Sequence, residues 1–220
     1  MIVRDLGLTD YRAAWNTQLE THAAVAEGRC PPTLLLTEHP PVITFGKKGG
    51  RANLLSDPAL LEAQGFSLFD IERGGDVTYH GPGQLVGYPI LPIGRAVRSY
   101  LRNLEAVMVQ VLAEYGLTGV GSPGYAGVWV GDKKVVAIGV AIKRNVSFHG
   151  FAMNVSTDLT HFSHIVPCGI YDRGVTSLSA LLDRPVTLAE VKPKLVRAFA
   201  DTFEVDISAS LQPVESEVIV

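Results

Sequence analysis

Helical and extended segments follow one another in this chain without the regular strand–helix alternation that builds a parallel sheet. Apolar residues recur at helical spacing over residues 97–115, and a second helix is expected over 9–27, ended by Gly28. Short apolar runs at 34–38 and 42–45 are typical of strands. The pattern predicts an α+β fold with a mixed, largely antiparallel sheet flanked by helices.

The remaining expected elements fit the same class. A short helix at residues 57–64 is expected to be capped by Ser56 and stopped by Gly65. The others are a strand at 66–72, a hairpin of 128–130 with 134–142 around Gly131 and Asp132, a strand at 147–155, and a helix from Thr187 to about Phe203. Pro193 lies within this last helix and predicts a kink or a late start.

Composition limits the class of protein. With 220 residues and 47% hydrophobic content, the chain can bury a full core. No linker or repeat divides it, so we expect one domain over residues 1–220, with a tail from about 206 that lacks a distinctive pattern. The net charge of -3 argues against a nucleic-acid partner. Without a signal peptide or a membrane-spanning apolar run, the chain is expected to be a cytoplasmic monomer with no membrane partner.

Cys168 lies between Pro167 and Gly169, and this frame is typical of a presented nucleophile. Pro167 fixes its own φ, while Gly169 allows a sharp turn or the close approach of a backbone N–H. A buried, inert thiol is the alternative, since a reactive cysteine needs an activating neighbour. A disulfide with Cys30 is not expected in a reducing compartment.

Lys134 opens a strand whose alternating side chains are apolar and branched on one face and small on the other. A lysine desolvated on the apolar face can serve as a base near neutral pH, whereas a solvated hairpin turn is the simpler interpretation. The small face, with Ala137 and Gly139, allows a ligand to come close. Simple alternation puts Lys134 opposite that face, so a twist or a bulge must reconcile the two if both serve one site.

The stretch from Arg73 to Gln84 is rich in glycine and proline and carries Asp76, Thr78, Tyr79 and His80. It is expected to be a ligand-wrapping loop, because glycines expose backbone N–H groups and tolerate strained conformations. His80 and His149 each precede a glycine, and either could partner a nucleophilic thiol.

Two apparent motifs lack the context that their function needs. The glycines of residues 119–124 match a dinucleotide fingerprint, but a helix precedes them and a strand follows, so a loop is expected. No nucleotide P-loop sequence is present. His161, His164 and Cys168 have spacing that could bind zinc, but no fourth ligand is evident, and surface histidines on a short helix are the expected alternative.

Four segments, in this order along the chain, together resemble the lipoyl(octanoyl) transferase family. They are residues 73–85, 134–139, 149–154 and 167–169. The resemblance covers the chain from about Glu38 to Ser177. It implies the fold shared by the catalytic domains of biotin and lipoate protein ligases, with the acyl chain in a tunnel.

The same resemblance implies a role for individual residues. Cys168 matches the acyl-accepting nucleophile and Lys134 the lysine that activates it. The implied substrate-binding residues are Arg73, Gly74, Gly75, Asp76, Val77, Thr78, Tyr79, His80, Ala137, Ile138, Gly139, His149, Gly150, Phe151 and Ala152. No cofactor and no metal are implied.

The implied reaction moves an octanoyl or lipoyl group from acyl carrier protein, through a cysteine thioester, to a lysine of a lipoyl domain. The implied acceptors are the lipoyl domains of 2-oxoacid dehydrogenases and the glycine cleavage H protein. An ATP-dependent lipoate- or biotin-protein ligase and a non-enzymatic acyl-binding module are the alternatives. An acidic carrier needs a basic patch, and two clusters are candidates: Arg95, Arg98 and Arg102, and Lys47, Lys48 and Arg51.

Overall fold

The computed structural model describes residues 1–220 except 49, 123–124, 167–173 and 208–220. Seven strands form a large sheet in the order β1-β2-β6-β10-β9-β8-β7. They are β1 (Ile2–Leu8), β2 (Thr33–Glu38), β6 (Gln84–Ile90), β7 (Val120–Ser122), β8 (Tyr125–Val130), β9 (Lys133–Lys143) and β10 (Val146–Asn154). Apart from the parallel pair β1–β2, every pairing in this sheet is antiparallel. The predicted mixed, largely antiparallel α+β class is therefore confirmed.

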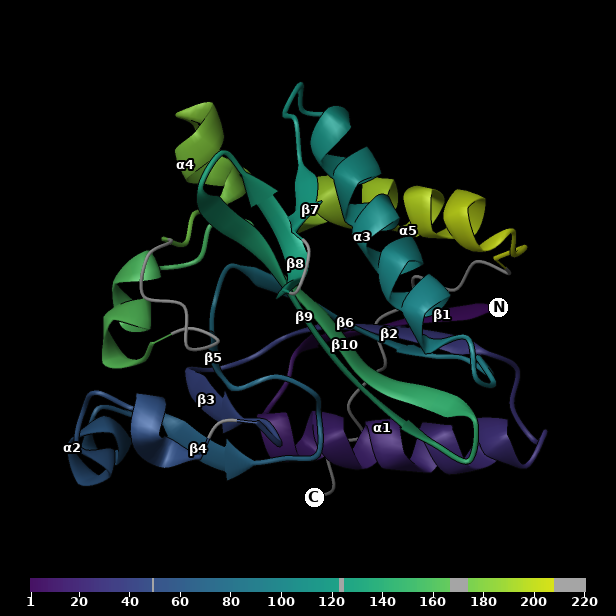
Figure 1. Ribbon diagram of the computed structural model, residues 1–220, viewed down its shortest axis with the longest axis horizontal. Coiled ribbons are helices and arrows are strands. Elements are labelled where there is room, and N and C mark those ends of the chain that lie inside the picture. Colours follow the sequence, from purple (N-terminus) through teal and green to yellow (C-terminus); the bar gives the residue numbers. More distant parts are fainter. Residues whose placement is uncertain (49, 123–124, 167–173, 208–220) are drawn as a thin grey trace, which may run out of the picture.

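Helices cover both faces of the large sheet. The described helices are α1 (Tyr11–Ala26), α2 (Pro58–Ala63), α3 (Val97–Ala113), α4 (Leu178–Leu182) and α5 (Leu188–Phe203), with 3-10 turns η1 (Arg51–Asn53) and η2 (Leu159–His164). In Figure 1, α3 and α5 lie on one side of the sheet and α1 on the other. The run Leu34–Leu36 is apolar at every position because Leu34 and Leu36 face the α3–α5 side while Leu35 faces the α1 side.

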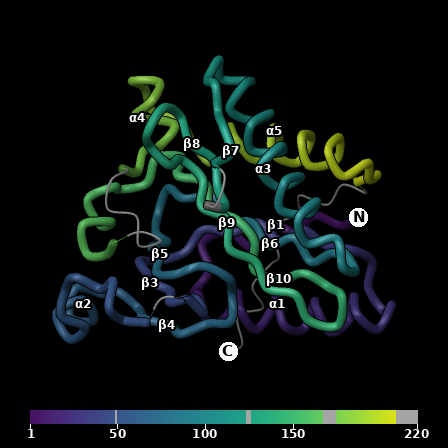
Figure 2. Tube along the Cα trace, viewed as in Figure 1, coloured from purple at the N-terminus to yellow at the C-terminus, as the bar shows by residue number. Residues whose placement is uncertain are grey.

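A second, smaller sheet has the order β4-β3-β5, from β3 (Val42–Phe45), β4 (Ser67–Asp70) and β5 (Val77–His80). Strands β3 and β4 are parallel, whereas β3 and β5 are antiparallel. The tube in Figure 2 shows this sheet beside α1 and η2, although η2 is far away in the sequence. Its core contains Val77 and Tyr79 together with Phe162 and Ile165. The small sheet therefore ties the glycine-rich stretch to the segment that leads toward residue 168.

Several local predictions need correction. Strands β1, β6 and β7 and helix α4 were not expected, and Gly87 and Pro89 hide the strand character of β6. The expected loop at 73–84 contains strand β5. Strands β5 and β6 are recognised only through their ladder partners β3 and β10, which lie far away in the sequence.

Two helix ends also differ from expectation. Helix α2 is capped by Asp57 rather than Ser56, because the Asp57 carboxylate accepts from the N–H groups of Ala59 and Leu60. Helix α5 begins at Leu188, directly after its Thr187 cap, so the late start expected from Pro193 is wrong. The Thr187 side chain accepts from the Glu190 N–H, as the predicted capping box requires.

Candidate functional site

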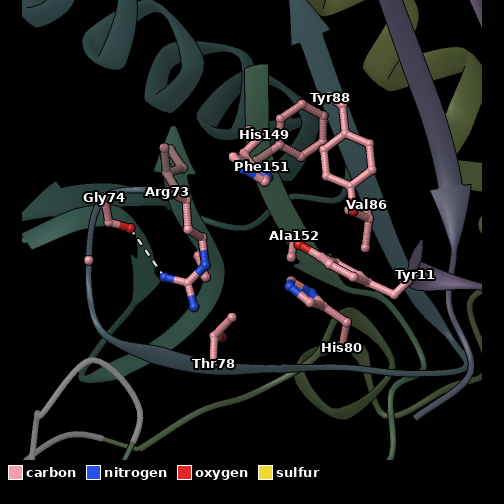
Figure 3. Close-up of a pocket in the computed structure, with 15 residues that line it drawn as sticks. Tyr11, Arg73, Gly74, Thr78, His80, Val86, Tyr88, His149, Phe151 and Ala152 are labelled. Carbon is pink, nitrogen blue, oxygen red and sulfur yellow. Dashed lines mark hydrogen bonds between the residues drawn. The ribbon is translucent and has the colours of Figure 1, made fainter. Parts of the chain in front are cut away.

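A pocket open to solvent lies between the small sheet, α1 and the centre of the large sheet. Of the predicted substrate-binding residues, those lining it are Arg73, Gly74, Gly75, Thr78, His80, Ala137, Ile138, Gly139, His149, Gly150, Phe151 and Ala152. Figure 3 shows Arg73 and Thr78 on one side and Tyr11, His80 and Tyr88 on the other. The structure thus brings residues of the segment 73–80 together with residues of β9 and β10 around one space, which we call the acyl pocket because the resemblance given above implies an acyl chain there.

Asp76, Val77 and Tyr79 do not line the acyl pocket. Side chains alternate along β5, so Thr78 and His80 face the pocket while Val77 and Tyr79 enter the core of the small sheet. Asp76 instead accepts from the Asn53 side chain and, at 2.6 Å, from the Val77 N–H. The Asp76 carboxylate therefore holds the loop in place, and this role explains why the motif has an aspartate at this position.

Tyr11, Val86 and Tyr88 also line the pocket, and sequence reasoning missed them as site residues. Tyr88 and Val86 belong to the unexpected strand β6, and Tyr11 begins α1. Nothing local in the sequence marks them, because Val86 and Tyr88 reach the pocket through the pairing of β6 with β10, and Tyr11 through packing against the small sheet.

Neutral imidazoles lie at the Tyr88 side of the pocket. His39 Nδ1 lies 2.7 Å from the Thr9 carbonyl oxygen, which can only accept, so Nδ1 carries the proton. Its Nε2 then accepts from the Tyr88 hydroxyl at 2.7 Å. Burial lowers the pKa of His39 to about 4 and that of His80 to about 3. Both rings are therefore uncharged at neutral pH.

His149 occupies a strained position beside these rings. Its φ is 53°, in the left-handed region that non-glycine residues rarely adopt. The backbone N–H of His149 donates to Gln18 Oε1 at 3.0 Å, and the imidazole Nε2 lies 3.5 Å from Glu72 Oε2. Burial lowers the pKa of His149, and the contact with His149 lowers that of Glu72. Such strain is typical of functional sites, where the surrounding contacts hold it in place.

Arg73 crosses from the loop to the small sheet. Its Nη2 donates to the Thr44 carbonyl at 2.7 Å and to Thr44 Oγ1 at 2.9 Å. A Cβ added to Gly139 would lie 3.1 Å from Arg73 Cδ and 3.0 Å from the Gly74 carbonyl. Gly139 is therefore needed because the arginine side chain and the loop backbone pass directly over β9.

Lys134 is buried, with 6% of its surface exposed. The β8–β9 ladder pairs Val128 with Val136 but Trp129 with Lys134, so β9 holds one extra residue there. This bulge moves Lys134 to the face of Ala137, and a second cavity is lined by both residues. The conflict predicted from simple alternation is thus resolved by a bulge. The Lys134 amine lies 4.7 Å from the centre of the Trp129 ring.

The second cavity, which we call the lysine chamber, adjoins the acyl pocket. Thr78, Ala137 and Ala152 line both. Ala137 and Ala152 are direct partners in the β9–β10 ladder, so only small side chains lie where the two cavities adjoin. The Lys134 side chain therefore lies just beyond the β9–β10 wall of the acyl pocket.

Cys168 lies outside the described residues, but both flanking segments are described. The Val166 N–H donates to the Asn53 carbonyl at 2.9 Å. On the other side, the Gly174 carbonyl accepts from the Lys134 N–H at 2.9 Å. The segment that contains Cys168 therefore returns to the described structure beside Lys134.

The residues of the other motifs have separate surroundings. His161 Nδ1 lies 2.7 Å from the Tyr79 hydroxyl, and His164 Nδ1 lies 2.8 Å from Ser56 Oγ. Within the described residues, no three His, Cys, Asp or Glu side chains come together to hold a metal ion. Val120–Ser122, expected in a loop, forms strand β7 paired with β8. Among the residues the structure describes, no helix is long and apolar enough to cross a membrane.

The two predicted basic clusters lie in different parts of the structure. Arg98 and Arg102 are exposed on α3, but Arg95 precedes this helix, so the three do not form one helical row. The N–H groups of Lys47 and Lys48 donate to the carbonyls of Arg73 and Gly75, both at 3.0 Å. Lys47 and Lys48 are exposed and thus lie beside the loop that lines the acyl pocket.

Comparisons with known proteins agree on one family. Residues 10–200 match the model of the lipoyl protein ligase A/B catalytic domain. The chain is 45% identical to the octanoyltransferase of Alkaliphilus metalliredigens, covering 96% of this chain and 98% of that protein. It is 46% identical to the octanoyltransferase of Geobacter metallireducens, covering 90% and 92%.

Solved structures share the fold. A putative lipoate protein ligase from T. acidophilum, solved with bound lipoic acid, matches with a TM-score of 0.75 and 21% identity, covering 97% of this chain and 91% of that one. The biotin protein ligase of Aquifex aeolicus matches with a TM-score of 0.53 and 13% identity, covering 92% and 68%. At such identities the likeness concerns the fold alone.

Proposed function

The chain belongs to the family of lipoyl protein ligase A/B catalytic domains and is an octanoyltransferase, and we propose that it carries the octanoyl group as a thioester on Cys168. The observation that supports this most is the buried Lys134, in a cavity that adjoins the acyl pocket. Cys168 is two residues from Val166, so their Cα atoms are at most about 7 Å apart. The chain that carries the proposed nucleophile continues to Gly174, whose carbonyl accepts from the backbone N–H of the proposed base, Lys134.

In the first step the Cys168 thiolate attacks the octanoyl thioester on acyl carrier protein. A C–S bond forms to Cys168, the C–S bond to the carrier breaks, and the carrier thiol leaves with the proton that Lys134 took from Cys168. One thioester replaces another of similar energy, so no nucleotide is required. The neutral His80 and His149 rings and the apolar side chains of the acyl pocket suit an uncharged chain.

In the second step a lysine amine of a lipoyl domain attacks the acyl-enzyme. A C–N bond forms, the C–S bond breaks, and Lys134 passes a proton from the amine to the departing Cys168 sulfur. Both steps need a proton acceptor, because free thiols and amines are mostly protonated at neutral pH. The proposed acceptors are lipoyl domains of 2-oxoacid dehydrogenases and the glycine cleavage H protein.

Mass spectrometry of the intact protein tests this function. After incubation with octanoyl-acyl carrier protein, the mass should rise by one octanoyl group that hydroxylamine removes. The Cys168→Ala variant should gain no mass and should not acylate a lipoyl domain. An enzyme that stays fully active as Cys168→Ala but requires ATP and free octanoate would instead be a ligase, and a protein that only binds the donor would be a binding module.

A further inference from the structure

Two buried amide side chains connect the acyl pocket with the backbone around Lys134. Gln84 and Asn154 are direct partners in the β6–β10 ladder and are 2% and 5% exposed. Gln84 Nε2 donates to Asn154 Oδ1 at 2.8 Å, and Asn154 Nδ2 donates to the Thr176 carbonyl at 3.0 Å. His80 Nδ1 lies 2.7 Å from Gln84 Oε1.

The direction of each hydrogen bond in this chain is fixed. The carbonyls of Thr176 and Tyr79 can only accept, so the NH₂ groups of Asn154 and Gln84 must face them. Gln84 Oε1 is therefore an acceptor, and His80 carries its proton on Nδ1. Its Nε2 remains an acceptor, and the ring lines the acyl pocket. A buried network in which every orientation is determined is rigid.

Lys134 lies at the far end of this network. The β10–β9 ladder ends at the pair Met153–Val136, and Lys134 pairs instead with Val175 in a parallel bridge. Residues 174–176 replace β10 there: the Lys134 N–H donates to the Gly174 carbonyl and the Thr176 N–H donates to the Lys134 carbonyl, both at 2.9 Å. Asn154, the next residue after Met153, is the side chain that holds Thr176.

We propose that Asn154 is a positioning residue for Lys134, which it holds through Thr176 at the end of the acyl pocket. This inference rests on the proposed function, because it assigns Asn154 a role through the proposed base. The Asn154 amide joins β10 to residues 174–176, and these residues fix both backbone groups of Lys134. The same Asn154 amide accepts a hydrogen bond from Gln84, and Gln84 in turn binds His80 in the lining of the acyl pocket. The network therefore keeps the Lys134 amine at a constant position relative to that pocket.

The test compares Asn154→Leu and Asn154→Ser with Ser147→Ala. Ser147 is buried on the same strand, and its hydroxyl donates to the Pro89 carbonyl at 2.8 Å, so Ser147→Ala also removes a buried hydrogen bond but outside both cavities. Single-turnover acylation by a small soluble octanoyl thioester is measured over a range of donor concentrations, which gives both the rate at saturation and the KM. Misplacement by about 1 Å costs on the order of 100-fold, so both Asn154 variants should be about 10- to 100-fold slower, with KM within about twofold. Ser147→Ala should match wild type.

A double-mutant cycle separates positioning from a general loss of structure. In the Lys134→Ala background, acylation is measured near pH 9, where a thiol with a pKa of about 8.5 ionises without help. Adding Asn154→Leu there should cause no further loss, because the residue through which Asn154 acts is gone. An equal loss in both backgrounds would overturn the inference, as would a wild-type rate for both Asn154 variants.

The same experiment keeps this inference separate from the proposed function. If Lys134→Ala alone acylates at the wild-type rate near neutral pH, the proposed role of Lys134 is wrong and the inference about Asn154 is wrong with it. If Lys134→Ala is slow and the Asn154 variants are not, only the inference about Asn154 is wrong. Asn154→Ser is the smaller change and serves if Asn154→Leu does not fold.

Discussion

The two adjoining cavities handle ionisable groups in opposite ways. In the acyl pocket, burial lowers the pKa values of His80 and His149, so that both imidazoles are neutral, and Arg73 supplies the charged group of the lining. In the lysine chamber, the Lys134 amine lies against the Trp129 ring, and its backbone N–H and carbonyl both bind residues 174–176. Neutral rings suit the binding of an uncharged chain, whereas a fixed amine suits proton transfer. The comparison teaches that two adjoining spaces can divide these tasks between them.

The strongest challenge to this division is Lys134→Arg. Guanidinium keeps a positive charge but does not release its proton near neutral pH, so it cannot act as a base. Loss of general base catalysis typically costs about 100- to 10,000-fold, and we expect a loss of that size in octanoyl transfer to a lipoyl domain. Lys133→Arg, at the exposed neighbouring position, is the control. A Lys134→Arg enzyme as fast as wild type would show that no proton transfer occurs there.

The variant Ala152→Leu tests whether the acyl chain extends from the acyl pocket toward the lysine chamber. Ala152 and Ala137 face each other where the two cavities meet, so a leucine should obstruct a long chain more than a short one. We expect the ratio of octanoyl to butyryl transfer to fall about tenfold, the size of a contact worth about 1–2 kcal/mol. A ratio does not depend on the folded fraction. Ala141→Leu, on β9 outside both cavities, should leave the ratio unchanged. An unchanged ratio in Ala152→Leu would place the acyl chain elsewhere.

The lowered pKa values of the buried histidines predict that stability depends on pH. The pKa values of His39 and His80 are about 4 and 3 in the folded protein, against about 6.5 in the unfolded chain. Below pH 6.5 the unfolded chain binds more protons at these sites, so the free energy of unfolding falls as pH falls toward those values. Between pH 7.5 and 5.5 each ring should contribute a loss of about 1 kcal/mol.

Urea unfolding at the two pH values measures this loss. His80→Gln should lose about 1 kcal/mol less than wild type between them, because it has no imidazole to protonate. Ser147→Ala, which is also destabilised, should keep the full wild-type difference. If His80→Gln shows the wild-type difference, His80 is not the group that titrates.

The smallest expected effect concerns docking of an acidic carrier. Lys47 and Lys48 lie on the loop bound to Arg73 and Gly75, whereas Arg98 and Arg102 lie on α3. Reversing both lysines to glutamate should slow association with octanoyl-acyl carrier protein a few-fold at low salt and little near 1 M salt. The matched pair Arg98→Glu and Arg102→Glu should have less effect. Equal losses with a small octanoyl thioester would show damage to the site rather than lost docking.

Elements with a strong local pattern were predictable, and elements defined by distant partners were not. The amphipathic repeat of α3, the capping box of α5 and the turn at Gly131 each appear as predicted. Strand β6 was missed, although it lies at the centre of the sheet and supplies Tyr88 to the pocket. Its glycine and proline weaken the local signal, and it becomes a strand only through pairing with β2 and β10.

The sequence by itself determined which residue types the site has available: a lysine at the start of a strand, small residues beside it, and a glycine-rich segment with arginine and histidine. Only the tertiary structure decided how they meet. The bulge in β9 turns Lys134 toward Ala137, and the alternation of β5 sends His80 into the pocket but Tyr79 away from it. Asn154 holds residues 174–176 against Lys134. A chain's pattern sets periodicity, but where a ladder shifts by one residue depends on the packing of segments far apart, which no local pattern contains.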